Sequence, residues 1–178
     1  MKKLLVITYL LIAMVTVHGQ SYLGFVNKTV NLREGPGKEF NILLTVNAGS
    51  KIFIISLEEE NEFLNVIDIE SGTEGFVHRD FAKAEDVIIA APGSIFSTTG
   101  KIDDENPVLT VKNNTSKILT LKLNKLVFTF RAGETRAISV PPGSYRVIAS
   151  APRVIPMTGT DKLEKNLSYR WKFYLKDE

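Results

Sequence analysis

The chain has 178 residues, of which 22 are Lys or Arg, 20 are Asp or Glu, two are His and none is Cys. Hydrophobic residues make up 44%, an ordinary proportion for a globular protein, so extensive disorder is not expected. The lack of Cys excludes disulfide bonds, a thiol nucleophile and a zinc-thiolate site. The sequence predicts no cofactor and no metal site.

The first residues have the features of a secretory signal. Two lysines are followed by an uncharged apolar run, residues 4–17. This run is shorter than the about 20 residues that a membrane-spanning helix needs, but it suits the apolar region of a signal peptide.

Small residues mark the expected end of this signal. Val17 and Gly19 stand before a cut that leaves Gln20 as the first mature residue. We therefore expect residues 1–19 to be a signal peptide and the mature chain to be exported, to the periplasm or outside the cell, with no stable membrane span. An uncleaved anchor is the alternative. Because no Cys follows the run, the chain is not expected to be a lipoprotein.

Removal of the signal changes the charge balance. It takes away two lysines, so the mature chain holds 20 basic and 20 acidic residues. Nucleic acid is therefore not an expected partner. Residues 20–85 carry six basic and eleven acidic residues, a net charge of −5, whereas residues 86–178 carry +5. This asymmetry indicates either that the halves attract each other or that they face different partners.

The first half is predicted to be β-structure. Apolar, β-branched runs occur at residues 51–57 and 63–69, with a shorter one at 74–77, and glycines lie between them. A helical turn is expected only near residues 80–84.

An octamer near the start of this half carries a family resemblance. Residues 30–37 read Val-Asn-Leu-Arg-Glu-Gly-Pro-Gly, an alternating strand followed by a forced turn, which resembles the opening signature of bacterial SH3 (SH3b) domains. Segments similar to the rest of that family follow in the same order, at residues 41–46, 48–51, 62–66, 72–77 and 78–81. The resemblance covers residues 24–83 and implies a small, partly open β-barrel that recognises peptidoglycan or a peptide. We assign residues 20–85 to this barrel.

Six residues are the candidate ligand-binding positions of this barrel. Asn31 and Arg33 are predicted to point outward, and Arg33 could either hold the next loop or reach a ligand carboxylate. Either Phe40 or Phe63 is expected to be partly exposed. Phe63 and Phe76 stand where the family often has Trp. Glu62 belongs to the acidic run 58–62, which is either a solvated turn or a rim for a cationic group.

The second half is predicted to be a small antiparallel β-sandwich of the immunoglobulin-like or fibronectin-like class, over residues 107–178, after a linker at 86–106. Leu119, Leu121 and Leu123 alternate with polar residues, and Tyr169, Trp171, Phe173 and Leu175 share one face of a closing strand. Arg146, Arg170 and Lys172 are expected on outward faces, either as a basic patch or as a solvated sheet face.

These features favour a non-enzymatic binding module. The expected partner is a cell-wall peptide or peptidoglycan, or another envelope protein. The alternative is a structural or assembly component that binds only other proteins, by sheet-edge pairing for example. An enzyme is disfavoured because His78 is the one His left after signal removal and no Ser-x-x-Lys element is present.

Overall fold

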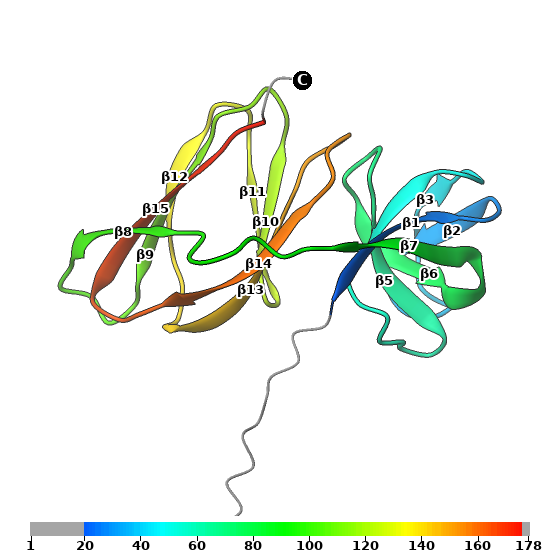
Figure 1. Ribbon diagram of the computed structural model, residues 1–178, viewed down its shortest axis with the longest axis horizontal. Helices are drawn as coiled ribbons and strands as arrows, with labels where there is room; N and C mark the ends of the chain where they lie inside the picture. The colour runs from blue at the N-terminus through cyan, green and yellow to red at the C-terminus, as the bar shows by residue number, and fades with distance from the viewer. Residues whose placement is uncertain (1–19, 176–178) are drawn as a thin grey trace, which may run out of the picture.

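The computed structural model describes residues 20–175, so the expected signal peptide at 1–19 lies outside them. The predicted all-β class is confirmed, since the described residues form fifteen strands and one short 3-10 helix, η1 (Arg79–Phe81). None of the helices in this part of the chain is long and apolar enough to cross a membrane. Figure 1 shows two lobes side by side, which we call the first unit (β1–β7) and the second unit (β8–β15).

The first unit is a seven-stranded antiparallel sheet in the order β3-β2-β6-β5-β4-β1-β7. Its strands are β1 (Ser21–Val26), β2 (Val30–Arg33), β3 (Ile42–Val46), β4 (Lys51–Ile54), β5 (Phe63–Asp68), β6 (Glu74–His78) and β7 (Ala82–Ile88). Val46 of edge strand β3 shares a core with Val26 of β1 and Ala82 of β7, several strands away. The sheet therefore curls around one core but keeps two open edges, and the described residues form no closed barrel.

The second unit consists of two four-stranded sheets packed on a common core. One sheet contains β11 (Leu126–Phe130), β10 (Leu119–Leu123), β13 (Gly143–Ser150) and β14 (Met157–Leu163), in that order. The other contains β12 (Thr135–Ser139), β9 (Val108–Asn113), β15 (Leu167–Phe173) and β8 (Ser97–Lys101). As predicted, Leu119, Leu121 and Leu123 are fully buried, and Tyr169 and Phe173 face the core.

Two sequence expectations about this half were wrong in detail. The sandwich is not wholly antiparallel, because β15 pairs in parallel with β9. The expected 86–106 linker contains the end of β7 and all of β8, which leaves a connection of residues 89–96. Strand β8 was not predicted because every residue in it is exposed, so it pairs through its backbone without an apolar pattern.

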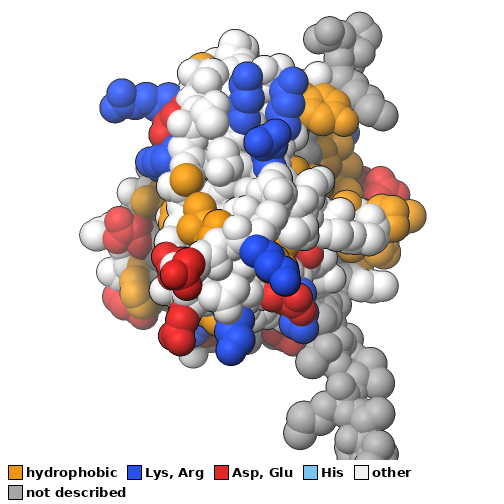
Figure 2. Space-filling view, turned by 90° about the vertical axis from the view of Figure 1, so that its left-hand side faces the viewer, with side chains coloured by type: hydrophobic (Ala, Val, Ile, Leu, Met, Phe, Trp, Pro, Cys, Tyr) orange, Lys and Arg blue, Asp and Glu red, His pale blue; other side chains and the backbone are white. Residues whose placement is uncertain are grey.

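Figure 2 views the end formed by the second unit, where blue Lys and Arg side chains gather near the top.

The two units are docked against each other through apolar side chains. Phe53, Ile55 and Ile67 of the first unit form a buried cluster with Ile148 of β13. Phe53 alternates with Ile52 and Ile54, which face the core of the first unit. Both faces of β4 are thus buried, as in a central strand covered on two sides. This explains why the apolar residues within 51–57 follow one another without polar residues in alternation.

Polar contacts between the units follow the charge asymmetry of the sequence. Lys122 of β10 pairs with Glu74 of β6, and Arg153 Nε lies 2.7 Å from Glu70 Oε1. In both pairs the cation comes from the positive half and the carboxylate from the negative half. These two ion pairs support the interpretation that the oppositely charged halves attract each other.

Arg146 departs from its expected place on a solvated face. It does point outward from its own sandwich, but that face of β13 meets the first unit. The guanidinium donates to Ser21 Oγ at 2.9 Å and to the Ile55 carbonyl oxygen. Burial lowers the pKa of Arg146, while Glu58 opposes this change. The proposed basic patch with Arg170 and Lys172 therefore lacks Arg146.

The loop between β5 and β6 also touches the second unit. Gly72 has φ of +74°, and a Cβ added there would lie 3.2 Å from the Pro152 nitrogen. Glycine meets both needs, because it adopts positive φ freely and lets the two backbones approach.

Candidate functional site

A groove of about 510 Å³ opens on the first unit, away from the contact with the second. Residues from β2, from the turn after β1 and from the segment around η1 form its walls. We call it the basic groove; its lining residues include Lys28, Asn31, Arg33, Lys38, Phe63, His78, Asp80 and Phe81.

Three rings form the aromatic wall of the basic groove. The His78 ring lies between Phe63, at a centroid distance of 5.3 Å, and Phe81, at 5.4 Å. His78 Nδ1 accepts a hydrogen bond from the Asp80 backbone N–H at 3.3 Å. This bond and the two ring contacts hold the imidazole in one orientation. Phe63 is buried, so the ring area open to a ligand comes from the partly exposed His78 and Phe81.

Lys28, Arg33 and Lys38 supply the positive charge of the groove. Lys28 Nζ lies 3.7 Å from the centroid of the Phe81 ring, a cation–π contact. Arg33 Nη1 donates to the Phe40 carbonyl oxygen at 2.7 Å, so this side chain does hold the turn that follows it. None of these three cations forms an ion pair with a carboxylate of residues 20–175.

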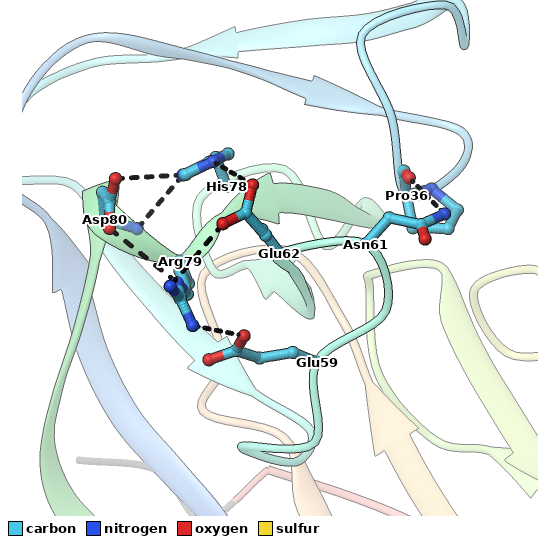
Figure 3. Close-up of polar contacts among 7 residues, drawn as sticks. All are labelled: Pro36, Glu59, Asn61, Glu62, His78, Arg79 and Asp80. Carbon is cyan, nitrogen blue, oxygen red and sulfur yellow. Dashed lines mark hydrogen bonds and ion pairs between the residues drawn. The ribbon is translucent and has the colours of Figure 1, made fainter.

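Two carboxylates of the acidic run beside the groove, those of Glu59 and Glu62, are paired with a cation. Figure 3 shows Arg79 between Glu59 and Glu62. Arg79 Nη1 lies 2.8 Å from Glu59 Oε2, and its Nη2 lies 3.6 Å from Glu62 Oε1. The hydrogen bond that Arg79 donates to Glu59 raises the pKa of Arg79. The carboxylates of Glu59 and Glu62 therefore neutralise a residue of the protein itself.

The backbone of the acidic run forms a tight hairpin turn. Glu60 and Phe63 exchange both backbone hydrogen bonds, at 2.9 Å each. Asn61 and Glu62 between them have φ of +50° and +67°, which matches the type I′ turn favoured in two-residue hairpins. Asn61 also donates to the Pro36 carbonyl oxygen at 3.3 Å, which ties this turn to the Gly-Pro-Gly turn (Figure 3).

The structure places the six candidate residues in four locations. Asn31, Arg33 and Phe63 line the basic groove. Glu62 lies at its rim, with Oε2 at 3.8 Å from His78 Nε2.

Phe40 and Phe76 lie elsewhere. Either Phe40 or Phe63 was expected to be partly exposed. Phe40 is 39% exposed, whereas Phe63 is 7% exposed. The Phe40 ring packs over the backbone of Gly35. Phe76 lines a different groove, of about 800 Å³, between the two units, where Ile118 and Val127 of the second unit form part of the opposite wall.

Sequence reasoning missed Lys28, Lys38 and Phe81 as parts of one site. They come from the turn after β1, the turn after β2 and the 3-10 helix. A sequence signal existed, because half of the six basic residues in this acidic half are Lys28, Arg33 and Lys38. The sequence does not show that they converge. Among the described residues, His and carboxylate side chains form no group of three or more suited to hold a metal ion.

No family model, no curated protein and no solved structure matches this chain.

Proposed function

We propose that this chain is an exported, non-enzymatic binding protein whose first unit binds a peptide through the basic groove. The peptide stems of peptidoglycan are the leading class of ligand. The likeness of residues 24–83 to SH3b domains supports this class, and the expected signal peptide supports export. The volume of about 510 Å³ falls within the range of about 300–1,000 Å³ common for ligand pockets.

The single observation that carries the proposal is the charge of the groove. Lys28, Arg33 and Lys38 line the groove with Asp80 as the one carboxylate among its lining residues, within a half of the chain whose net charge is −5. A local excess of cations without carboxylate partners favours a ligand that brings carboxylates. Arg33 keeps donors beyond Nη1, which is bound to Phe40, and a guanidinium can offer two parallel bonds to a carboxylate.

The opposite polarity receives less support. An acidic rim for a ligand amine would need carboxylates that are free to accept it. Glu59 and Glu62 instead contact Arg79, and Glu62 and Asp80 flank His78. Of the two roles considered for the acidic run, these contacts support the solvated turn as far as Glu59 and Glu62 are concerned.

The alternative, a protein-only assembly component, is favoured by the open sheet edges. Edge strand β3 exposes Ile42 at 52% and Leu43 at 40%, and edge strand β11 exposes Val127 at 57%. Apolar edge strands with unpaired backbone groups can accept a strand from a partner.

Sedimentation with purified peptidoglycan tests the proposal, using residues 20–178 and the double variant Lys28→Glu/Lys38→Glu. Both lysines are exposed, so the fold should tolerate the change. We expect binding to weaken by at least about tenfold, since one charge-assisted hydrogen bond contributes about 1.5–3 kcal/mol. Lys83→Glu is the matched control, because Lys83 is exposed on β7 and does not line the groove.

Three results would count against the proposal. Equal weakening by Lys83→Glu would indicate generic charge attraction. Unchanged binding in the double variant would remove the basic groove from the site. Absence of any sedimentation by the unmodified chain would reject the wall ligand and favour the assembly alternative. A soluble stem peptide with free carboxylates, compared with its amidated form, then measures the polarity of the ligand directly.

A further inference from the structure

Gln20 has a special position in the proposed exported form of the chain. A cut after Gly19 leaves Gln20 with a free α-amino group. Gln20 is exposed and precedes Ser21, the first residue of β1. Among residues 20–175, its side chain has one hydrogen bond, which Tyr22 Oη donates to Gln20 Oε1 at 3.2 Å. The residue is therefore free to change conformation without disturbing a strand.

The surroundings of Gln20 are formed by both units. Gln20 lines a pocket of about 290 Å³ together with Ser21 and Ile88 of the first unit and Arg146 and Thr160 of the second. Ser21 itself is 2% exposed and accepts the hydrogen bond from Arg146 at 2.9 Å. The new N-terminus thus lies at the junction between the units, one residue from a half-buried guanidinium.

A free N-terminus adds a second positive charge to this pocket. Arg146 is already partly desolvated, and the carboxylate that opposes the effect of burial is Glu58. Like charges repel more strongly in a partly desolvated pocket than in bulk water. We therefore expect an α-ammonium at Gln20 to weaken the contact between the units and a neutral N-terminus to leave it unchanged.

We propose that Gln20, once it is the first residue, is converted to pyroglutamate; this inference rests on the proposed export and the expected cut. The α-amino nitrogen attacks the side-chain amide carbon, Cδ, of the same residue. The N–Cδ bond forms, the Cδ–Nε2 bond breaks, and ammonia leaves with the proton lost by the amine. The product is a neutral five-membered lactam, and the reaction needs no oxidant or other reactant.

Mass spectrometry of the protein purified from the cell that exports it tests the modification. We expect a chain that begins at position 20, lighter than the free-glutamine form by one ammonia and unreactive toward amine-labelling reagents. A chain that begins at Gln20 with its full mass and a reactive amine would overturn the inference. A chain that begins elsewhere would overturn it too, while sedimentation with peptidoglycan still decides the binding proposal separately.

A second measurement tests the role of the charge. Residues 20–178, released from a fusion with Gln20 first, are melted before and after cyclisation. We expect cyclisation to raise the melting temperature by about 2–4 °C at low salt and by less at high salt. Gln20→Ala, which cannot cyclise, is the matched control and should keep the lower value through the same incubation. Equal melting temperatures for the open and cyclised forms would refute the charge argument.

Discussion

Replacement of Ile148 tests whether the two units act as one folded body. Ile148 is 3% exposed on β13, and its partners Phe53, Ile55 and Ile67 all belong to the first unit. Truncation to Ala removes buried methyl and methylene groups and leaves a cavity at the junction. Such a change costs about 2–5 kcal/mol when the surroundings relax only in part.

The expected loss of stability can be measured by thermal unfolding. For a chain of this size each 1 kcal/mol shifts the midpoint by about 2–4 °C, so a cost of about 2–5 kcal/mol should lower the midpoint of Ile148→Ala by about 4–20 °C. The chain has a single Trp, Trp171, which packs in the second unit against Phe96 at a centroid distance of 6.0 Å. Its fluorescence reports the second unit, whereas far-ultraviolet circular dichroism reports both. We expect the two signals to change together in the original chain and to separate in the variant.

Val127→Ala is the matched control for this experiment. Val127 lies on the same sheet as Ile148 but is 57% exposed, so its truncation should change stability by less than about 0.5 kcal/mol. An effect of Ile148→Ala as small as that of Val127→Ala would refute the docking of the units through this cluster.

Two further predictions concern the second unit. Asn113 is fully buried, and its Nδ2 donates to the carbonyl oxygens of Lys117 at 2.7 Å and Arg131 at 2.9 Å, so Asn113→Ala should cost about 2–4 kcal/mol in urea unfolding. Asn114, the exposed neighbour, serves as control, and a comparable loss of stability in Asn114→Ala would contradict this explanation. Burial raises the pKa of Tyr145 above its ordinary value of 10.0. Because the folded state then holds this proton more tightly than the unfolded state, the free energy of unfolding should fall as the pH rises above about 10. Tyr145→Phe should lose less stability over that range, and equal alkaline losses in both proteins would contradict the assignment.

Much of the secondary structure could be predicted from residue patterns. The expected strands at 51–57, 63–69 and 74–77 correspond to β4, β5 and β6, and a single 3-10 turn occurs at residues 79–81. These segments were recognisable because apolar side chains mark a buried face. Strand β8 carried no such mark, and the parallel pairing of β15 with β9 leaves no trace in the alternation of either strand.

The candidate site was predicted only in part. Sequence reasoning could predict Asn31 and Arg33 because both belong to the octamer at residues 30–37. It could predict Phe63 because this residue begins the apolar run at 63–69. Lys28 and Lys38 could not be predicted in this way, because each lies in a turn without a recognisable motif. Their place in the basic groove depends on residues that are distant in the sequence. Phe76 was placed in the same site because it shares the aromatic pattern, but the direction of its side chain depends on how β6 faces the second unit.

The sequence by itself determined the all-β class, the strands with a buried apolar face and the opposite charges of the two halves. These are local or additive properties, which depend on side-chain type and spacing along the chain. Only the tertiary structure decided that the units dock through Phe53 and Ile148, that Arg146 is half-buried rather than solvated, and which cations share a groove. Each of these depends on residues far apart in the sequence, whose burial and charge environment exist only after the sheets have packed.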